Sequence, residues 1–482
     1  MQNYETVIGL EIHAQLLAES KMFCSCSTKF GNQPNINICP VCTGQPGVLP
    51  VMNKKALDFA IKTGLALHCK IAPHSIFARK HYFYPDLPKN FQISQYELPI
   101  AENGYLEIEV NGNIKKVRIN RVHLEEDAGK LVHKGSDRIM GADYSLVDLN
   151  RTGVPLMEIV TEPDMHSPEE AKVFMAELRK IVRYLDVCDG NMEEGSLRCD
   201  ANISLRPAGE TKLGKKTEVK NMNSFKIVQK ALELEVERQT KVLTEGGTII
   251  QETRHYDETS NSTISLRTKE AEMDYRYFPE PDLIPIKTDQ KWIDGIKNTL
   301  PELPIEKLKR FVSSYQLPVA SAEVLTLERD LSDFFEEAVK IHNNPKIMAN
   351  WVVGNLMGYM NFNNLTIKQL KIGPKHIADL VSLIDKNTIT GNSAKDVLAK
   401  MLEAGKSAHD IVSESGMTQL NDESSLLPTI QRAISANPKS VEDYKKGKEN
   451  AIMHLVGQVM RETKGRANPE VVKKMLREEM NK

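Results

Sequence analysis

The sequence predicts an α+β protein in which a mixed or antiparallel sheet is followed by helices. Apolar and polar residues alternate strictly over residues 7–16 and again over residues 196–206, which predicts two strands that each bury one face. Beyond about residue 300 the apolar residues recur with helical spacing instead. The chain has 482 residues, which is too long for a single core and indicates several domains.

The first predicted strand, residues 7–16, separates an apolar face from a polar one. Its apolar face carries Ile8, Leu10, Ile12, Ala14 and Leu16. Glu11, His13 and Gln15 share the opposite face, because side chains alternate along a strand. A carboxylate and an imidazole that project together from a rigid strand are suited to metal binding or catalysis.

Four of the seven cysteines lie in one short segment, FCSCSTKFGNQPNINICPVC at residues 23–42. Cys24, Cys26, Cys39 and Cys42 form the pairs C-x-C and C-x-x-C. Two such pairs can place four thiolates around a tetrahedral Zn²⁺, and a site with four protein ligands has no open position for chemistry. The spacing therefore predicts a structural zinc; reduced free thiols and a redox pair stay open as alternatives.

Two helices are expected between and after these strands. In SPEEAKVFMAELRKIVRYLDV, Ser167 provides the N-cap, Pro168 occupies the first turn and Glu170 completes a capping box. The second helix covers about residues 225–244 and ends at the Gly246-Gly247 pair.

Glu158 is the most unusual acidic residue. It lies in VPLMEIVTEP, an apolar run typical of a buried strand, where an unpaired carboxylate costs several kcal/mol or becomes protonated. VHLEEDAGK adds Glu125, Glu126 and Asp127. Carboxylates with an imidazole on rigid strands suit Mg²⁺ or Mn²⁺ better than Zn²⁺.

Asp200 and Asn202 lie on the polar face of the strand at residues 196–206, where they can join such a metal site or support it. An alternative without metal stays open, in which the acids form ordinary ion pairs with nearby basic side chains. The candidate partners are Arg79, Lys80, Arg198 and Lys220.

Proline density rises in YFPEPDLIPIK and again in LPELP, which indicates a domain boundary at about residues 285–300. Helical segments follow, among them SDFFEEAVKIH, IMANWVVGNLMGYM and HIADLVSLID. The last stretch is locally basic through Lys445, Lys446, Lys448, Arg461, Lys464 and Arg466. A solvated helix surface explains such a run as simply as a nucleic-acid contact does.

The overall composition is that of an ordinary globular protein. Its 63 basic and 65 acidic residues nearly balance, so net charge alone predicts no polyanionic partner. No apolar run is long enough to span a bilayer, and the first residues alternate where a secretory signal is uniformly apolar. We expect a cytoplasmic protein with no membrane partner and no disulfide framework.

The standard phosphate-binding loops are missing from the sequence. It contains neither G-x-x-x-x-G-K-[ST] nor G-x-G-x-x-G after a strand, and it has no G-x-S-x-G elbow. A phosphate site must then use a metal ion and basic side chains. The residues alone indicate metal-dependent phosphoryl or hydrolytic chemistry on a zinc-braced sheet.

Long blocks of this sequence carry a family resemblance. They are ETVIGLEIHAQL, the CSC and CPVC pairs followed by GQPGVLPVMN, RKHYFYPDLPKNFQISQYELPI, HLEEDAGK, DLNRTGVPLMEIVTEPD, MEEGSLRCDANISLRP, DYRYFPEPDL and LVGQVMRETKGRANP. From its first residues to its last helix, the chain closely resembles the B subunits of the bacterial aspartyl/glutamyl-tRNA amidotransferases.

The resemblance implies a reaction and its cofactors. ATP phosphorylates the side-chain carboxylate of misacylated Glu-tRNA(Gln) or Asp-tRNA(Asn), and ammonia then displaces the phosphate to give the amide. By motif position it implies Mg²⁺ binding by Glu11, His13, Glu126 and Glu158, with Asp200 as a further catalytic residue. Arg79 and Lys80 are the candidates for phosphate contact.

The resemblance also implies an architecture and partners. We expect a cradle-shaped catalytic domain at residues 1–293, a helical domain at 294–405 and a small helical tail at 406–482 whose basic residues contact tRNA. The sequence has no Ser-rich amidase signature and no cysteine with an evident histidine partner outside the zinc set. The family implies that a partner amidase, its A subunit, supplies ammonia and that a small C subunit completes a heterotrimer.

Two other function classes stay open. A metal-dependent nuclease or phosphatase shares the acidic cluster but needs neither ATP nor ammonia. A non-catalytic RNA-binding scaffold has its acids in salt bridges. ATP cleavage that depends on misacylated tRNA separates all three.

Overall fold

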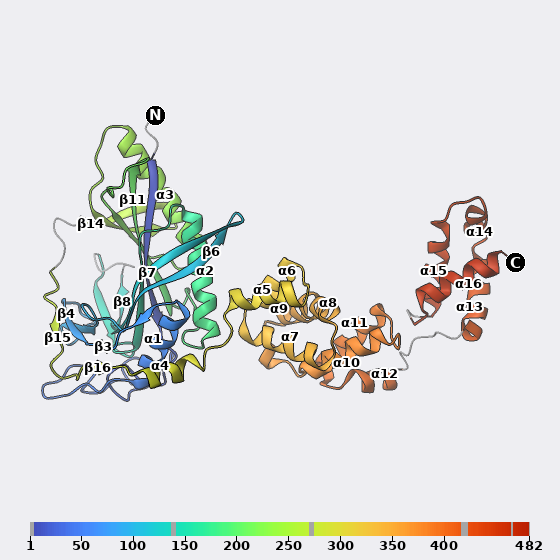
Figure 1. The fold of residues 1–482 in the computed structure, drawn as a ribbon, viewed down its shortest axis with the longest axis horizontal. Helices are drawn as coiled ribbons and strands as arrows, with labels where there is room; N and C mark the ends of the chain where they lie inside the picture. Colours follow the sequence, from blue (N-terminus) through green and yellow to red (C-terminus); the bar gives the residue numbers. More distant parts are fainter. Residues whose placement is uncertain (1–3, 136–140, 269–273, 416–422, 464–465, 482) are drawn as a thin grey trace. The chain divides into compact units, whose positions relative to one another are not determined.

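The computed structural model describes residues 4–135, 141–268, 274–415, 423–463 and 466–481. It divides into two compact units, Met1–Leu303 and Pro304–Lys482 (Figure 1). Among the described helices, none combines the length and the apolar character that a membrane crossing requires.

The first unit is built on a mixed nine-stranded sheet of order β14-β13-β12-β11-β1-β10-β7-β6-β2. All neighbouring strands are antiparallel except β12 and β13, which are parallel. The strands of this sheet are β1 (Tyr4–Gln15), β2 (Lys70–Ile71), β6 (Ala101–Val110), β7 (Asn113–Glu126), β10 (Pro155–Thr161), β11 (Leu197–Pro207), β12 (Thr217–Lys220), β13 (Glu252–Asp257) and β14 (Ser262–Thr268). The predicted α+β class with a mixed sheet is confirmed.

Among the described residues, three smaller sheets accompany the large one, with orders β15-β4-β5, β16-β3 and β8-β9. Their strands are β3 (His74–Ser75), β4 (Ala78–His81), β5 (Phe91–Ser94), β8 (Lys130–Lys134), β9 (Tyr144–Asp148), β15 (Phe278–Pro279) and β16 (Ile286–Lys287). The β15-β4-β5 sheet lies beside the end of β7, since Ser94 and Gln95 bond to Glu125 and Leu124 there.

The strand β1 lies at the centre of the sheet, between β10 and β11. Its apolar face is buried, from Ile8 at 0% exposed to Leu16 at 4%, as the alternation predicts. The helices α1 (Lys54–Ala66), α2 (Pro168–Tyr184) and α3 (Phe225–Thr244) contribute to the same hydrophobic core, and α2 and α3 run along one face of the sheet in Figure 1. The polar face of β1 is therefore left for chemistry.

The predicted start of α2 is confirmed at its N-cap. The Glu170 N–H donates to Ser167 Oγ at 3.1 Å. In a capping box the Glu170 carboxylate would accept a hydrogen bond from the Ser167 N–H. It instead accepts one from the His166 N–H at 2.6 Å and forms an ion pair with Lys115 at 2.7 Å. A basic side chain on the β7 strand thus draws this carboxylate away from the cap.

From residue 290 on, the secondary-structure elements in the described part of the chain are all helices. They are α4 (Gln290–Lys297), α5 (Pro304–Ser314), α6 (Val319–Leu325), α7 (Arg329–Ile341), α8 (Pro345–Asn350), the π-helical η1 (Trp351–Leu356), α9 (Met357–Asn363), the 3₁₀ turn η2 (Ile367–Gln369), α10 (Pro374–Asp385), α11 (Gly391–Ala404), α12 (Ala408–Ser415), α13 (Glu423–Ala436), α14 (Pro438–Lys445), α15 (Ala451–Glu462) and α16 (Pro469–Met480).

The described residues of the second unit form two separate hydrophobic clusters. The first runs from Phe311 to Val412 and the second from Leu426 to Met480. The expected boundary at 405 places α12 in the tail, whereas Ile411 and Val412 of α12 are buried in the first cluster. The first unit likewise extends to Leu303, ten residues past the expected boundary at 293. The assignment of separate roles to the three regions stays a prediction.

Candidate active site and cysteine centre

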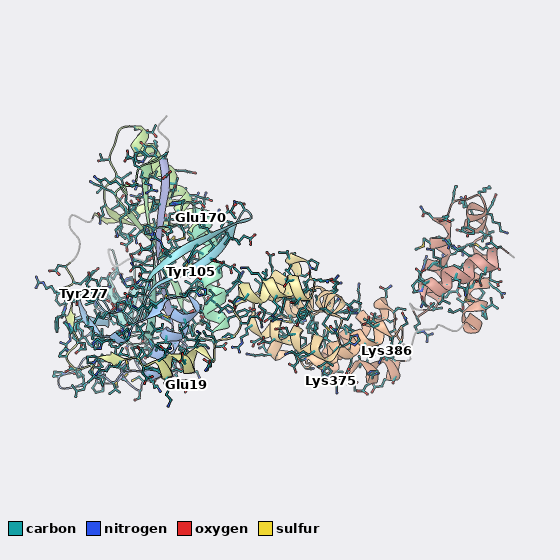
Figure 2. All side chains as sticks on the ribbon, in the orientation of Figure 1. Glu19, Tyr105, Glu170, Tyr277, Lys375 and Lys386 are labelled. Atoms are coloured by element: carbon teal, nitrogen blue, oxygen red, sulfur yellow. The ribbon has the colours of Figure 1, made fainter. Side chains whose placement is uncertain are left out.

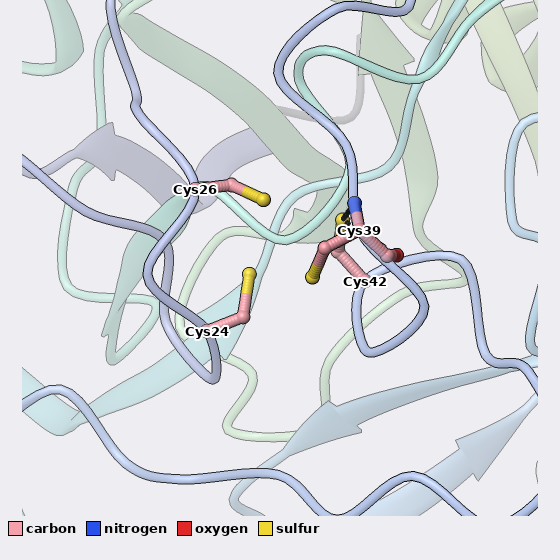
Figure 3. Close-up of side chains that lie close together, drawn as sticks. All are labelled: Cys24, Cys26, Cys39 and Cys42. Atoms are coloured by element: carbon pink, nitrogen blue, oxygen red, sulfur yellow. Dashed lines mark hydrogen bonds between the residues drawn. The ribbon is translucent and has the colours of Figure 1, made fainter.

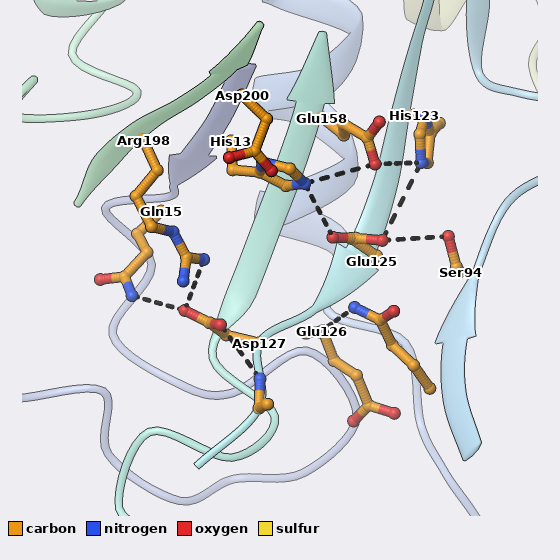
Figure 4. A network of polar contacts seen from close by, with 12 residues as sticks. His13, Gln15, Ser94, His123, Glu125, Glu126, Asp127, Glu158, Arg198 and Asp200 are labelled. Atoms are coloured by element: carbon orange, nitrogen blue, oxygen red, sulfur yellow. Dashed lines mark hydrogen bonds and ion pairs between the residues drawn. The ribbon is translucent and has the colours of Figure 1, made fainter. Parts of the chain in front are cut away.

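A row of four polar side chains crosses the centre of the sheet on the face that the helices leave open. The register aligns Arg198 of β11 with His13 of β1, His13 with Glu158 of β10, and Glu158 with His123 of β7. Paired residues of neighbouring antiparallel strands project to the same face, and Figure 4 shows these side chains together. Glu125 joins them, because it lies two residues beyond His123 on β7.

His13, Glu125 and Glu158 converge, and we call them the carboxylate–histidine cluster. The His13 Nε2 atom lies 3.5 Å from Glu158 Oε2 and 3.7 Å from Glu125 Oε1. One ligand atom of each residue lies within 4.8 Å of the other two. His123 Nε2 supports the group at 3.2 Å from Glu158 Oε2. Both carboxylates are buried, so the predicted burial of Glu158 is confirmed.

The cluster holds a positive charge between its carboxylates. Burial lowers the pKa of His13, but the hydrogen bond and the charge of Glu158, with the charges of Glu125 and Asp200, raise this pKa to about 9. Burial raises the pKa of Glu158, yet His123 and His13 bring it well below its ordinary value. Two buried carboxylates and an imidazole form a donor set that fits Mg²⁺ or Mn²⁺, and the charge of such an ion would take the place of the His13 proton.

Glu126, a metal ligand predicted from the sequence, lies outside the cluster. Adjacent residues of a strand point to opposite faces, so Glu125 points into the cluster and Glu126 points away from it (Figure 4). The Glu126 carboxylate accepts a hydrogen bond from the Ile93 N–H at 3.0 Å and forms an ion pair with Lys89. It lines a cavity of about 150 Å³ on the side of the cysteines.

Glu11 and Asp200 lie opposite each other on β1 and β11, one step along from the row. Asn202 Nδ2 donates to Glu11 Oε1 at 2.9 Å, and Asp200 forms an ion pair with Lys220. Asp200 is close enough to His13 to raise its pKa. Both acids therefore flank the cluster, with their oxygens already bonded to protein donors.

Arg79 and Lys80 are neighbours on β4 and point in opposite directions. The Arg79 guanidinium donates to both oxygens of Glu280, at 2.7 and 2.8 Å, and is held there. Lys80 faces the cluster: burial lowers its pKa, but the charges of Glu125, Tyr277 and Glu158 raise it above its ordinary value. Within the described chain no carboxylate forms an ion pair with Lys80, which leaves its ammonium for an anionic ligand.

Arg198 was not among the site residues expected from the sequence, yet it stands beside His13 in the row. Its Nη2 donates to Asp127 Oδ2 at 3.0 Å, and Gln15 Nε2 donates to the same oxygen at 2.6 Å. The Arg198 Nε is buried and has no hydrogen-bond partner in the described part of the chain. A buried donor of this kind normally binds water or a ligand.

The four cysteines predicted to bind zinc come together. One sulfur atom of each lies within 4.8 Å of the others, as Figure 3 shows. In a tetrahedral site with Zn–S bonds of about 2.3 Å the sulfurs are about 3.8 Å apart, so small side-chain shifts suffice to bind the ion. The C-x-x-C turn is shaped for it, since the Cys39 N–H donates to Cys42 Sγ at 3.2 Å.

Lys21 adds positive charge to the cysteine centre. This lysine is 1% exposed, and its Nζ lies 3.5 Å from Cys42 Sγ. The hydrogen bond from Cys24, with the charge of Lys21 as a smaller cause, lowers the pKa of Cys42 to about 4. An ammonium beside the sulfurs offsets part of the excess negative charge of four thiolates around one Zn²⁺, so the donor set fits this metal.

The cysteine segment is fastened to the sheet beside the active site. The Met22 N–H donates to the Gly153 carbonyl at 2.7 Å, just before β10 begins. Asn35 and Asn37 bond to Asp148 and Asn150 at 3.1 and 2.8 Å. A metal that fixes the cysteine segment therefore also fixes the approach to β10, the strand that carries Glu158.

The basic residues of the tail are distributed over its surface. Lys445, Lys446, Lys448 and Arg461 are exposed, but Lys446 pairs with Glu442 at 2.5 Å and Lys448 with Asp443 at 3.0 Å. Arg466 donates to the Thr463 carbonyl at 3.2 Å. Lys464 lies outside the described residues.

Comparison with known proteins identifies the family. Residues 6–294 match the GatB/GatE catalytic domain, and residues 333–480 match the GatB domain. The B subunit of the aspartyl/glutamyl-tRNA(Asn/Gln) amidotransferase of Carboxydothermus hydrogenoformans is 54% identical over 482 residues, all of both chains. The B subunit of Thermodesulfovibrio yellowstonii is 55% identical over 473 residues, 98% of both chains. That of Moorella thermoacetica is 52% identical over 477 residues, 99% of this chain and 100% of the relative. The chain therefore belongs to the GatB family, and the carboxylate–histidine cluster lies in the region that matches its catalytic domain.

Proposed function

We propose that this chain is the subunit of an ATP-dependent aminoacyl-tRNA amidotransferase that binds misacylated tRNA and activates its side-chain carboxylate. The substrates are Glu-tRNA(Gln), Asp-tRNA(Asn) or both, and the products are the corresponding amides. One observation carries the proposal: the carboxylate–histidine cluster lies within the residues that match the family's catalytic domain. We assign the reaction to the cytoplasm, where tRNA is charged.

The chemistry explains why a site of this kind is needed. A carboxylate is a poor electrophile, so ammonia does not displace its oxygen directly. Transfer of the terminal phosphoryl group of ATP to one carboxylate oxygen gives an acyl phosphate and ADP. Ammonia then attacks the carbonyl carbon, and phosphate leaves with that carboxylate oxygen. The protein contributes positioning and charge compensation to these steps.

We assign the Mg²⁺ of the reaction to His13, Glu125 and Glu158, with Glu11 and Asp200 beside them. When bound, Mg²⁺ supplies the positive charge that compensates the phosphate oxygens during transfer. His123 orients Glu158 through its contact at 3.2 Å, so the imidazole fixes one carboxylate of the set.

Two cations of the chain itself complete the assignment. The Lys80 ammonium, which faces the cluster, binds phosphate oxygens of ATP. Arg198 is held by Asp127 and keeps a donor unpaired beside His13 in the described chain, so we assign it to the substrate carboxylate. Arg79, whose guanidinium is bonded to Glu280, has no direct role in this proposal.

ATP cleavage by the purified complex tests the proposal. We expect cleavage with Mg²⁺ and misacylated Glu-tRNA(Gln) or Asp-tRNA(Asn), and a large fall in its rate when correctly aminoacylated tRNA replaces them. RNA cleavage or phosphate-ester hydrolysis without ATP would support the nuclease or phosphatase alternative. Binding of tRNA without any ATP cleavage would support the scaffold alternative.

The cysteine centre is proposed as a structural Zn²⁺ site, and elemental analysis should find one zinc per chain. Cys42→Ser should remove the metal and lower the free energy of unfolding by about 3 kcal/mol or more, because the bound metal stabilises only the folded segment. Cys69→Ala is the matched control: Cys69 is buried outside the centre, so zinc content should not change. Protein purified without chelators that contains no zinc would contradict the assignment.

The basic tail is proposed to contact the tRNA backbone. Deleting residues 423–482 should weaken tRNA binding and flatten its dependence on salt concentration, since phosphate contacts release counterions. Lys445→Gln combined with Arg461→Gln should reduce the salt slope by about one unit for each cation that contacts a phosphate. Lys386→Gln, at the end of α10, is the control. Unchanged affinity and salt slope in the deletion variant would refute the proposed contact.

We further propose that a partner amidase, the A subunit of the enzyme, supplies ammonia and that a small C subunit completes a heterotrimer. The relatives are each named as a B subunit, which supports a complex of several chains. The sequence carries no glutaminase signature of its own, which supports a division of labour between chains.

A further inference from the structure

Four tyrosines gather where the small β15-β4-β5 sheet meets the polar face of the large one, and we call them the tyrosine cluster. Tyr82 follows β4, Tyr96 follows β5, and Tyr275 and Tyr277 precede β15. The end of β4 and the segment that precedes β15 are joined by a hydrogen bond from the His81 N–H to the Tyr275 carbonyl at 2.9 Å. Residues far apart in the sequence are thus brought together by the pairing of two short strands.

Strand alternation places the tyrosines on the same face as Lys80. The register pairs Phe278 with Arg79, and these two side chains share one face, where the Arg79 guanidinium lies 5.5 Å from the Phe278 ring centroid. Their chain neighbours Tyr277 and Lys80 therefore point to the other face, which is the face toward Glu125. The tyrosine cluster borders the active site for this reason.

The rings are arranged as a platform with one open side. Tyr96 and Tyr277 are stacked, with centroids 4.2 Å apart and planes inclined by 7°. Tyr275 meets Tyr277 edge-on at 6.1 Å, and Tyr82 meets Tyr275 edge-on at 6.4 Å. Tyr96 remains 50% exposed although one of its faces is covered by Tyr277. Its other face is therefore available for a further planar ring, at ordinary stacking distance.

Lys80 is close to both the platform and the carboxylate–histidine cluster. Its ammonium lies 5.0 Å from the centroid of the Tyr275 ring, and the charges of Glu125 and Glu158 raise its pKa. Burial raises the pKa of Tyr277 to about 12, with Glu125 and Glu158 adding to the effect. The phenol is thus neutral at physiological pH and does not repel an anionic ligand that passes Lys80.

We propose that the tyrosine cluster stacks the adenine base of ATP, with Tyr96 as the outer ring and Lys80 beside the phosphate chain that runs from the base toward the carboxylate–histidine cluster. This inference rests on the proposed function, because it takes ATP as a substrate. Stacking on an aromatic ring recognises the π-face of a base and contributes substantially to nucleotide binding.

Two substrates of the reaction contain adenine: ATP and the 3′-terminal adenosine of the tRNA. Charge complementarity favours ATP as the ligand of the tyrosine cluster. In ATP, the part that links the base to the reacting phosphoryl group is a ribose followed by negatively charged phosphates. In aminoacyl-tRNA, the corresponding part is a ribose ester with a positively charged α-ammonium group. In the proposed arrangement Lys80 lies beside this linking part of the ligand. Its ammonium attracts the phosphates of ATP and repels the α-ammonium group of aminoacyl-tRNA.

Calorimetric titration of the full-length chain with Mg²⁺-ATP, with Mg²⁺-tripolyphosphate and, in a third series, with tRNA tests this proposal. Tyr96→Leu and Tyr277→Leu should raise the Kd for ATP between about 5-fold and about 150-fold, the range that loss of one stacking ring produces. The Kd for tripolyphosphate should not change, since it has no base. Tyr96→Phe keeps the ring and should bind ATP as the unsubstituted chain does.

Tyr105→Leu is the matched control, because Tyr105 is also stacked on an aromatic ring, His68 at 4.3 Å, and also has a lysine over it. It lies on β6, apart from Tyr277 (Figure 2). Tyr96 is half exposed, so Tyr96→Leu tests the platform even if Tyr277→Leu does not fold.

Three results would overturn the inference. ATP affinity that both leucine variants retain would exclude stacking on these rings. Equal losses for ATP and tripolyphosphate would show that the tyrosines act on the phosphate site instead of the base. Weaker binding of tRNA with unchanged ATP affinity would assign the platform to the terminal adenosine. Absence of ATP binding by the unsubstituted chain would instead refute the proposed function itself.

Discussion

Glu158→Gln is expected to lower tRNA-dependent ATP cleavage by about 10²- to 10³-fold or more, the range seen when one preorganised electrostatic contact to a transition state is removed. The amide is nearly isosteric with the carboxylate but is neutral, so the cluster loses half of its carboxylate charge. Glu158 raises the pKa of His13 and lies 3.2 Å from His123 Nε2, so both imidazoles lose their common partner. The affinity for tRNA should stay nearly unchanged.

Glu162→Gln is the matched control for this variant. Glu162 directly follows β10, and its carboxylate bonds to Asn120 at 2.7 Å outside the cluster. Thermal unfolding of both variants separates loss of activity from loss of fold. Near-normal ATP cleavage by folded Glu158→Gln protein would mean that the metal lies elsewhere.

A second comparison uses the neighbours on β7. Because Glu125 points into the cluster and Glu126 away from it, Glu125→Gln should lose ATP cleavage as Glu158→Gln does. Glu126→Gln should retain it, with some loss of stability, because its partner Lys89, whose side chain is 9% exposed, is left without a full counter-charge. The reverse outcome would restore Glu126 as the metal ligand.

The purified chain alone is expected to form no amide from glutamine, even with ATP, Mg²⁺ and misacylated tRNA. Free ammonia is scarce at neutral pH because most of it is protonated, and the sequence has no signature for a residue that would release it from glutamine. High concentrations of an ammonium salt should restore amide formation, or should do so once the partner amidase stabilises the complex.

Amide analysis of the aminoacyl group after tRNA deacylation measures this directly. The control reaction contains the chain, glutamine and an added glutaminase of unrelated origin, which should restore part of the activity by releasing ammonia. Glutamine-dependent amide formation by the chain itself, with contaminating amidase excluded, would contradict the division of labour and require a nucleophile within this chain.

The elements with a strong period were predictable from sequence. Strict alternation located β1 and β11 and sorted Glu11 and His13 from the buried side chains, and the N-cap at Ser167 located α2. These signals are local, because a strand or helix face is decided by a few neighbouring residues. The order of the nine strands was not predictable in this way, since β1 pairs with β10 and β11, which lie far along the chain.

Which of Glu125 and Glu126 points into the cluster could not be predicted from local sequence patterns. Both lie in HLEEDAGK, and only the phase of alternation on β7 separates them. His123 carried the missing signal: it pairs with Glu158 across β7 and β10, and Glu125 lies on its face because it is two residues away. Unless it is known that β7 pairs with β10, the sequence does not show which face of β7, and therefore which of the two glutamates, lies on the side of His13.

The unpaired donor of Arg198 and the tyrosine cluster depend on contacts that no sequence period encodes. The alternation along β11 does place Arg198 on the polar face. Its hydrogen bond to Asp127, however, joins β11 to the residue after β7, and two other strands lie between β11 and β7 in the sheet. The tyrosines come from three separate segments. The cysteines are the opposite case, because all four ligands lie within 19 residues and their spacing alone was sufficient.

The most direct test of carboxylate activation by this chain follows one oxygen atom. Misacylated tRNA whose side-chain carboxylate carries ¹⁸O is incubated with the complex, ATP, Mg²⁺ and an ammonium salt, and the released inorganic phosphate is analysed by mass spectrometry. If the carboxylate is phosphorylated and ammonia displaces the phosphate, one labelled oxygen leaves with each phosphate for every amide formed. Inorganic phosphate without the label, at a normal yield of amide, would contradict an acyl phosphate intermediate and the proposed role of the carboxylate–histidine cluster.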